Sequence, residues 1–280
     1  MRVALTGASG FVGRHVLAEL IKQQIEVVAI TRKAATLKGL NKSCQIVEMD
    51  IGRSVPDCLE QVGYPDVWIH LAWDGLPNYN SLHHFEEELP AHYRFLNSLV
   101  RSGLKSLVVT GTCFEYGMQS GPLNEGLETR PTNSYGFAKD ALRRQLEYLR
   151  QDQPFALTWA RLFYLYGAGQ SENSLFPQLK RAVEGGDKVF NMSGGEQLRD
   201  YLPIFKMAKC LVFLATKRPD TGIVNICSGK PISVRKLVEG WIKDNDWPIK
   251  PNLNYYPYPD YEPMAFWGDR HKLDSCMETK

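Results

Sequence analysis

A tyrosine and a lysine stand four positions apart at Tyr135 and Lys139, the only such pair in the chain. On a helix, side chains with this spacing share one face, so the phenol and the ammonium would be neighbours. A nearby ammonium favours the phenolate and lowers the pKa of tyrosine from about 10. Such a tyrosine can exchange a proton with a carbinol oxygen near neutral pH. The pair therefore indicates proton transfer to or from an alcohol or ketone, although chance also produces this spacing.

A hydroxyl group is expected beside this pair. The apolar stretch Leu104–Thr110 predicts a strand that ends close to Thr112. The tyrosine and lysine open a predicted helix over 134–152, which Asn133 or Ser134 would cap. A threonine at that strand end can hydrogen-bond the same substrate oxygen as the tyrosine, or it can simply satisfy backbone groups. Threonine, tyrosine and lysine beside a nicotinamide would form a hydride-transfer site.

Three glycines, Gly7, Gly10 and Gly13, lie between a short apolar run at Val3–Leu5 and an amphipathic stretch that starts at Phe11. This order predicts a strand, a tight loop and the first turn of a helix. Such a loop aims unpaired N–H groups and the positive end of the helix dipole at an anion. A glycine-rich turn without a ligand is the plainer interpretation. The strand before the loop and the helix after it favour binding of a dinucleotide pyrophosphate.

The second predicted strand, Glu26–Ile30, runs into Thr31, Arg32 and Lys33. A site for NAD usually carries an acidic residue near this strand end, where it binds the ribose hydroxyls. Two cations stand there in this chain, and they can pair with a 2′-phosphate. We therefore expect NADP(H) as the cofactor and NAD(H) as the alternative, although a solvated basic turn would look the same.

Two further strand ends should reach the same edge of the sheet. A third predicted strand ends in Asp50 and Ile51, and a fourth ends in the sequence His70-Leu71-Ala72-Trp73. Ligands collect at the carboxyl ends of parallel strands, so these residues should lie beside the cofactor. Asp50 is expected to accept a hydrogen bond from the adenine amine or to cap a helix. His70 is expected to be packed or structural.

Strands that alternate with helices predict an α/β fold with a parallel sheet and right-handed crossovers. The fold expected is a doubly wound (Rossmann) domain at residues 1–161 with a smaller C-terminal α/β substrate lobe at 162–280. Part of residues 204–230 is expected to return to the sheet. The aromatic segment at 251–267 is expected either to stack on a substrate ring or to pack one lobe on the other.

The composition is that of an ordinary globular protein, with 44% hydrophobic and 23% charged residues among 280. A net charge of +2 gives no reason to expect nucleic acid or a membrane surface as a partner. No apolar run approaches the ~18 residues that span a bilayer, and a strand beginning at Arg2 would leave no room for a signal peptide. Six scattered cysteines without a C-x-x-C pair indicate reduced thiols rather than a disulfide framework or a metal site. These features favour a cytoplasmic location.

The order of the motifs resembles the extended branch of the short-chain dehydrogenase/reductase family, which holds nucleotide-sugar epimerases, dehydratases and reductases. The residues that carry the resemblance are Thr6–Gly13, His70–Ala72, Thr112–Gly117, Tyr135–Lys139, Arg161–Gly167 and Arg199–Tyr201. They cover nearly the whole chain in order. The resemblance implies a nicotinamide cofactor and a nucleotide-diphosphate sugar as substrate.

The resemblance also implies roles for single residues. Thr112, Tyr135 and Lys139 would be catalytic, and Lys139 would also hold the nicotinamide ribose. Together with the strand-end argument, it places these residues at the cofactor: Gly7, Ser9, Gly10, Phe11, Val12, Gly13, Arg32, Lys33, Asp50, Ile51, Leu71, Ala72, Trp73, Tyr135, Lys139 and Leu162. Those expected at the substrate are Thr112, Cys113, Tyr164 and Arg199. Arg199 would bind the diphosphate through its guanidinium, unless it is a plain surface charge.

Two departures from the family bear on the substrate. The 4,6-dehydratases of the group carry an Asp–Glu pair directly after the catalytic threonine, and this pair eliminates water. Cys113 and Phe114 stand there in this chain, which disfavours a dehydratase. Tyr164 replaces an asparagine that contacts the sugar nucleotide in many members, so the shape of the pocket should differ.

These features predict NADPH-dependent reduction of a 4-keto-6-deoxyhexose linked to a nucleotide diphosphate, with Tyr135 as the general acid. Net reduction consumes cofactor, and the basic pair Arg32 and Lys33 favours NADPH, which cells keep largely reduced. A nucleotide-sugar 4-epimerase is the alternative built from the same residues. A cofactor-sensing regulator is the non-catalytic alternative, and the presence of the three catalytic residues argues against it.

A homodimer is expected because family members commonly pair two long helices across an interface. The corresponding helices are predicted at 82–102, with an interruption near Pro90, and at 134–152. The apolar positions suited either to that interface or to the core are Leu142, Leu146 and Leu149.

Overall fold

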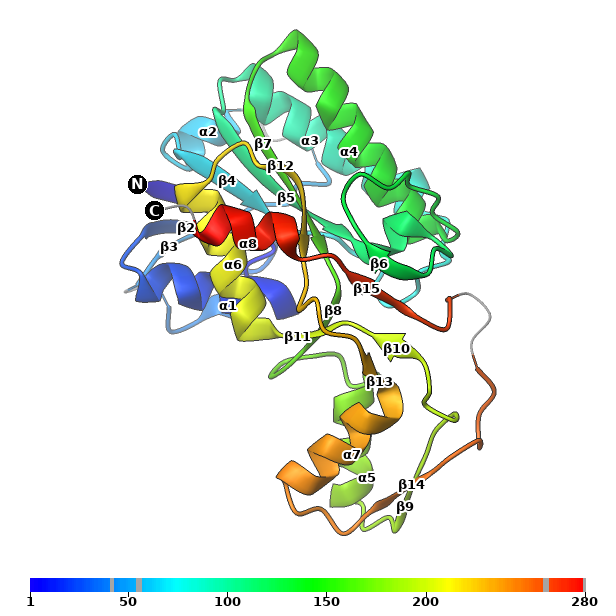
Figure 1. Ribbon diagram of the computed structural model, residues 1–280. Helices are drawn as coiled ribbons and strands as arrows, with labels where there is room; N and C mark the ends of the chain where they lie inside the picture. The colour runs from blue at the N-terminus through cyan, green and yellow to red at the C-terminus, as the bar shows by residue number, and fades with distance from the viewer. Residues whose placement is uncertain (41–42, 54–56, 259–261, 279–280) are drawn as a thin grey trace.

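The computed structural model describes residues 1–40, 43–53, 57–258 and 262–278. Its centre is a seven-stranded parallel sheet of order β12-β7-β5-β4-β1-β2-β3 (Figure 1). The strands are β1 Arg2–Thr6, β2 Glu26–Thr31, β3 Gln45–Glu48, β4 Val67–His70, β5 Ser106–Thr112, β7 Ala156–Leu162 and β12 Gly222–Ile226. The strand order reverses between β1 and β4, and open α/β sheets bind ligands in the crevice at such a reversal. The predicted doubly wound fold is confirmed.

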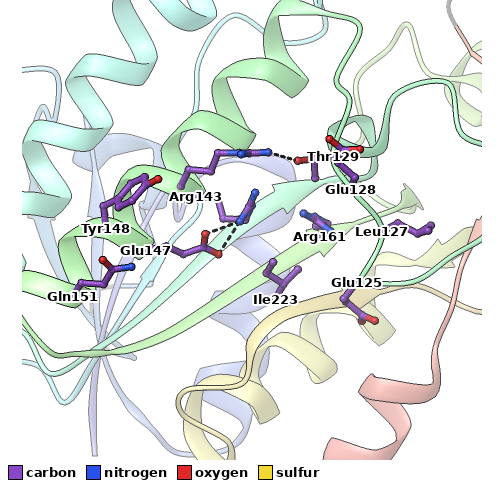
Figure 2. Close-up of a pocket in the computed structure, with 11 residues that line it drawn as sticks. Glu125, Leu127, Glu128, Thr129, Arg143, Glu147, Tyr148, Gln151, Arg161 and Ile223 are labelled. Carbon is purple, nitrogen blue, oxygen red and sulfur yellow. Dashed lines mark hydrogen bonds and ion pairs between the residues drawn. The ribbon is translucent and has the colours of Figure 1, made fainter.

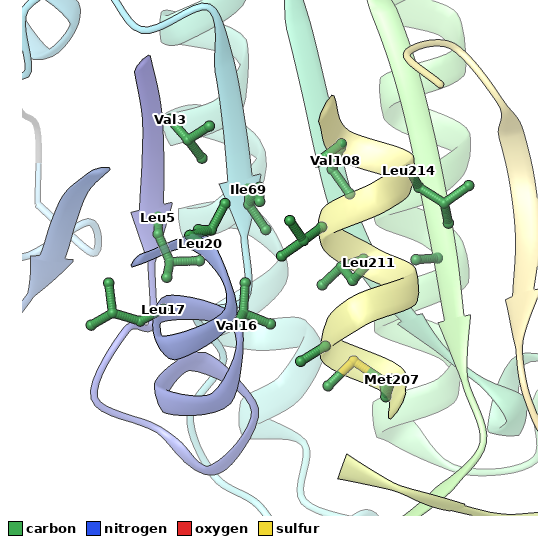
Figure 3. Close-up of a cluster of buried hydrophobic side chains, with 14 of the residues drawn as sticks. Val3, Leu5, Val16, Leu17, Leu20, Ile69, Val108, Met207, Leu211 and Leu214 are labelled. Carbon is green, nitrogen blue, oxygen red and sulfur yellow. The ribbon is translucent and has the colours of Figure 1, made fainter. Parts of the chain in front are cut away.

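Helices cover both faces of this sheet. One face carries α1 Phe11–Lys22, α6 Ile204–Lys217 and α8 His271–Glu278, and the other carries α2 Cys58–Gln61, α3 Leu89–Arg101 and α4 Ser134–Asp152. On the first face, α1 and α6 lie side by side and press apolar side chains onto β1, β4 and β5 (Figure 3). The side chains labelled there are Val3, Leu5, Val16, Leu17, Leu20, Ile69, Val108, Met207, Leu211 and Leu214. Burying one such large side chain contributes about 1.5–3 kcal/mol, so this layer holds the crevice in shape.

The smaller lobe is built from short elements and has a core of its own. Helices α5 Leu175–Glu184 and α7 Val234–Asp244 lie beside the parallel pair β9 Val189–Asn191 and β14 Lys250–Asn252 (Figure 1). Leu179, Val238 and Trp241 are buried between them. Three further short pairs are β8 Tyr164–Tyr166 with β11 Tyr201–Pro203, β10 Leu198–Arg199 with β13 Ile232–Ser233, and β6 Gly121–Leu123 with β15 Phe266–Gly268. Single helical turns are η1 Ala34–Leu37, η2 His84–Glu88 and η3 Cys113–Tyr116.

The predicted interruption near Pro90 is confirmed. The π-helical turn η2 gives way to α3, and Pro90 lies in the first turn of that helix. A helix needs no N–H donor in its first turn, so proline fits there. Residues 204–226 return to the large sheet as α6 and β12, while the division of the chain at residue 161 stays a prediction.

Helix α4 is fixed by its N-terminal cap and by its apolar face. Asn133 caps the helix by accepting a hydrogen bond from the Gly136 amide at 2.7 Å, as predicted. Leu142, Leu146 and Leu149 are buried against α3 and the sheet. They are therefore core positions, and the homodimer stays a prediction. Within the described ranges, no helix is both long and apolar enough to cross a bilayer.

Gly13 and Gly10 offer a matched test of the loop after β1. A Cβ on Gly13 would lie 2.0 Å from the Gly7 carbonyl oxygen, whereas one on Gly10 would lie 3.4 Å from that atom. We expect Gly13→Ala to lower the free energy of unfolding by about 1–3 kcal/mol, because α1 must move away from the loop at Gly7 and Ala8. Gly10→Ala should change stability little and weaken dinucleotide binding instead. Chemical denaturation measures the first effect, and equal losses in the two variants would contradict it.

Candidate active site

The loop after β1 is shaped to receive an anion. Gly10 precedes α1, and no side chain caps the first amides of that helix. Those N–H groups and the positive helix end are left for a ligand. Gly7 has a φ of +75° and lies against the end of β4, since a Cβ there would be 2.7 Å from the Ala72 nitrogen. The glycine loop and Leu71–Ala72 therefore meet at the crevice, and this cradle fits a dinucleotide pyrophosphate.

The basic pair follows the end of β2, as the sequence indicated. Thr31 is the last residue of the strand, and its hydroxyl lies 3.2 Å from the Ser9 hydroxyl. Arg32 comes next and forms an ion pair with Asp74 at 2.8 Å, in which both side chains are more than half exposed. Lys33 is exposed beside it. Both cations thus stand at the strand end that borders the glycine loop.

The other residues expected at the cofactor have local partners. Asp50 closes a turn by accepting the Gly52 amide at 3.1 Å, and it pairs with Arg53 at 3.3 Å. No helix starts directly after it in residues 51–53, which the structure describes. Four of the apolar residues are partly buried against the core around the loop and the strand ends: Phe11, Val12, Leu71 and Leu162. Ile51 is partly buried against the core on the opposite face of the sheet.

A buried carboxylate fixes Thr112 at the end of β5. Glu115 is fully buried and accepts the Thr112 amide at 2.9 Å, while the Thr112 hydroxyl accepts the Phe114 amide at 3.3 Å. Glu115 also forms an ion pair with Arg161 of β7, at 2.6 Å. The Thr112 hydroxyl satisfies a backbone group, as one interpretation held. The same hydroxyl is close enough to the Tyr135 phenol to oppose the rise in its pKa. The other interpretation, in which Thr112 also binds a substrate oxygen, stays a prediction.

Tyr135 and Lys139 are both buried in the first turns of α4. Burial raises the pKa of Tyr135, and the nearby phenol of Tyr79 acts in the same direction. Burial lowers the pKa of Lys139 to about 7, against the opposing effect of Glu115. The lysine ammonium lies over the Trp73 ring, 4.1 Å from its centroid. The expected lowering of the tyrosine pKa by Lys139 is therefore wrong for this structure, because burial dominates both groups.

Arg199 is buried at the side of the site that faces the smaller lobe. Its guanidinium binds Glu262 at 2.9 Å, and the Tyr164 hydroxyl donates to the other Glu262 oxygen at 2.5 Å. The idea that Arg199 is a plain surface charge is wrong. Burial also raises the pKa of the Cys113 thiol, which keeps its proton. The aromatic segment contributes Phe266, which packs on Tyr164 with ring centroids 5.9 Å apart.

Two cavities lie beside α4. The smaller, of about 200 Å³, is lined by Pro77, Asn78, Tyr79, Asn80, Phe114 and Asn133. Tyr79 joins it to the catalytic group, because its carbonyl accepts the Tyr135 amide at 2.9 Å. The larger, of about 370 Å³, lies between α4 and the segment 125–129 and contains the Arg143–Glu147 pair (Figure 2). Tyr135 and Lys139 do not line it, so the smaller cavity is the one beside the predicted chemistry.

A chain of buried imidazoles behind Trp73 was not foreseen. Thr6 bonds His70 at 2.8 Å, His70 bonds His92 at 2.7 Å, and His92 bonds Glu88 at 2.9 Å. His70 is fully buried, so the prediction of a packed role is confirmed. The missed signal was the four-residue spacing of His84, Glu88 and His92, which places them on one helical face.

The cysteines and carboxylates form no further site in the part of the chain that the structure describes. All six cysteines are free thiols. Among the described residues, no group of histidine, cysteine and acidic side chains is placed to hold a metal ion.

Comparisons with known proteins agree on one family. A family model described as "NAD dependent epimerase/dehydratase family" matches residues 3–227. The dTDP-6-deoxy-L-talose 4-dehydrogenase (NAD(+)) of Aggregatibacter actinomycetemcomitans is 31% identical over 270 residues, which cover 96% of this chain and 99% of the relative. The GDP-6-deoxy-D-talose 4-dehydrogenase of the same species is 26% identical and covers 98% and 90%. Among solved structures, MoeE5 in complex with UDP-glucose and NAD has a TM-score of 0.82 at 28% identity and covers 98% and 91%.

Glu115→Gln tests the buried ion pair. The change keeps the shape of the side chain but leaves the Arg161 cation buried without a counter-charge, so we expect a loss of about 3–5 kcal/mol in the free energy of unfolding. Glu128→Gln is the matched control, since Glu128 pairs with Arg130 and both are mostly exposed. It should cost less than about 1 kcal/mol. Urea denaturation of both variants measures the difference, and similar small losses would rule out the role given to Glu115.

Proposed function

The chain belongs to the NAD dependent epimerase/dehydratase family, and we propose that it reduces a 4-keto-6-deoxyhexose, linked to a nucleotide diphosphate, to the corresponding deoxysugar. The observation that carries the proposal is the burial of Thr112, Tyr135 and Lys139, of which the last two contact Trp73, next to the strand end that the glycine loop touches. The two Aggregatibacter relatives support the substrate class, since both are named as 4-dehydrogenases of 6-deoxytalose nucleotides. Reduction of the ketone is the reverse of the reaction in those names.

Each side chain has a defined task in this reaction. A bound nicotinamide supplies the hydride to the carbonyl carbon. Tyr135 keeps its proton because burial raises its pKa, and it donates that proton to the carbonyl oxygen. The Thr112 hydroxyl binds the same oxygen and orients it. The Lys139 ammonium binds the nicotinamide ribose and stabilises the phenolate that the transfer leaves behind.

Arg199, the residue expected to bind the substrate diphosphate, already binds a carboxylate in this structure. The Glu262 carboxylate binds the Arg199 guanidinium through Nη2, and the two groups are largely buried together. A diphosphate oxygen is the same kind of acceptor, and guanidinium groups bind such oxygens well. This supports Arg199 as the residue that holds the substrate diphosphate. Cys113 and Phe114 offer no ionised acid–base pair, which argues against water elimination.

Purified enzyme should consume NAD(P)H with at least one of the dTDP-, GDP- and CDP-linked 4-keto-6-deoxyhexoses. Tyr135→Phe should reduce turnover about 100-fold to 10,000-fold, the usual contribution of a general acid, and leave cofactor binding nearly intact. Absorbance of the reduced cofactor and its binding to the protein measure the two effects.

Two outcomes would replace the proposal. Interconversion of an unmodified nucleotide sugar, without net loss of reduced cofactor, would assign a 4-epimerase. Cofactor binding without turnover of any nucleotide sugar would assign a cofactor-sensing regulator.

We also propose NADP(H) as the preferred cofactor, because Arg32 and Lys33 directly follow the end of β2. The names of the first relative and of MoeE5 in its complex mention NAD, so the basic pair has to supply the preference in this chain. The Arg32 partner Asp74 is exposed, and a doubly charged 2′-phosphate competes with it for the guanidinium.

Arg32→Ala and Lys33→Ala should each lower kcat/KM for NADPH by about 10-fold or more and leave kcat/KM for NADH nearly unchanged, because a charge-assisted hydrogen bond contributes about 1.5–3 kcal/mol. Lys38→Ala is the control, since this exposed cation lies beyond η1. A higher kcat/KM for NADH in the unmodified enzyme would overturn the preference. A cytoplasmic location and a homodimer stay predictions.

A further inference from the structure

We propose that Trp73 is a positioning residue for Lys139, because its indole ring holds the ammonium at the site and is itself fixed by two histidines. The proposal rests on the proposed function in that it treats Lys139 as part of the catalytic group. The Lys139 nitrogen lies 4.1 Å from the Trp73 ring centroid. Among the described residues, no hydrogen bond or ion pair holds this nitrogen, so the ring face is its principal contact. A cation over a tryptophan face is attracted by the ring quadrupole, most strongly where water is excluded.

The indole ring is held on two sides. The His92 ring stacks on it with centroids 4.6 Å apart and an angle of 18° between the planes. Its Nε1 donates to His84 Nδ1 at 3.1 Å, and His84 Nε2 in turn donates to the Asn78 carbonyl at 2.8 Å. The next residue is held as well, since the Asp74 amide donates to Glu88 at 2.8 Å. Both the ring and its backbone are therefore anchored to η2 and α3.

The proton order in the imidazole chain is set by its ends. Burial lowers the pKa of His70 and His92, so both rings are neutral near neutral pH. Burial would raise the pKa of Glu88, but hydrogen bonds from His92 and the Asp74 amide outweigh it and lower the pKa to about 2. His92 must then donate to Glu88, His70 to His92, and Thr6 to His70. A neutral His92 ring supports Trp73 without repelling the ammonium.

The charge on Lys139 depends on the contact of its ammonium with the Trp73 ring. Burial lowers its pKa, and the pKa settles at about 7 once the opposing effect of nearby carboxylates is included. The carboxylates of Glu115 on η3 and Glu88 on η2 favour the charged form, while His70 on β4 and His92 on α3 would oppose it if protonated. Two further titratable groups face Trp73, namely His84 on η2 and Tyr135 on α4. Removing the ring face removes an attraction for the cation, so the pKa must fall and the charge must be lost at a lower pH.

Trp73→Leu and Trp73→Phe test this directly in the enzyme without substrate. In protein carrying isotope-labelled lysine, the Cε signal that disappears in Lys139→Met identifies Lys139. We expect its titration midpoint to fall by about one pH unit in Trp73→Leu, in proportion to the usual strength of a cation–π contact, and by less in Trp73→Phe. The ring-current shift of this signal should also be lost in Trp73→Leu and partly kept in Trp73→Phe.

Trp68→Phe is the matched control, because Trp68 is a buried tryptophan of β4, the strand that leads to Trp73, and packs on Phe95 with centroids 5.5 Å apart. It should cost stability and leave the Lys139 midpoint unchanged. A midpoint in Trp73→Leu equal to that of the unmodified enzyme would overturn the proposal, and so would an equal shift in Trp68→Phe.

The pH dependence of turnover provides a second readout. In Trp73→Phe the alkaline limb of kcat should move to lower pH, while KM for the substrate stays within about 2-fold. A fall in kcat without movement of the limb would mean that Trp73 has a merely structural role. The lysine titration needs no substrate, so it decides on Trp73 even if no nucleotide sugar is turned over.

Discussion

The buried ion pair between Glu115 and Arg161 ties two neighbouring strand ends together. Glu115 stands just past the end of β5, while Arg161 lies near the end of β7. The same carboxylate accepts the Thr112 amide, so the hydroxyl that faces Tyr135 takes its position from this pair. Such a pair contributes little net stability, because desolvation offsets the attraction. The pair fixes the positions of the two strand ends, since loss of either ion would leave the other charge buried without a partner.

Exclusion of water shapes the chemistry of the other two residues. Burial raises the pKa of Tyr135 and lowers that of Lys139, so both groups are pushed toward their neutral forms. A neutral phenol is the form that a proton donor needs. The ammonium keeps its charge through weaker sources, namely two carboxylates and one aromatic face. In the proposed reduction, the phenolate would form near an ammonium that is already in place, which is how preorganised sites lower barriers.

Short-range signals explain what the sequence alone could predict. The glycine loop, the Asn133 cap and the break at Pro90 depend on residues a few positions apart, and all lie where they were expected. The buried ion pairs, such as Arg199 with Glu262 and Glu115 with Arg161, join residues far apart in the chain. No local sequence pattern predicts them. The direction of the Tyr135 pKa was mistaken for a related reason. Spacing reveals a neighbouring charge, but only the packed structure reveals how little water surrounds it.

The return of β12 to the sheet has a consequence for synthesis of the chain on the ribosome. β7 is flanked by β5 on one side and by β12 on the other, and residues 163–221 separate β7 from β12. Until Gly222–Ile226 has emerged, β7 is an exposed parallel edge of the sheet. The sheet face beneath α6 stays uncovered until Ile204–Lys217 has been made. Open edges of this kind recruit other strands. The large sheet is therefore completed only after α5 and β9 of the smaller lobe have been made, and a nascent chain that stalls before β12 exposes the edge of the strand that bears Arg161.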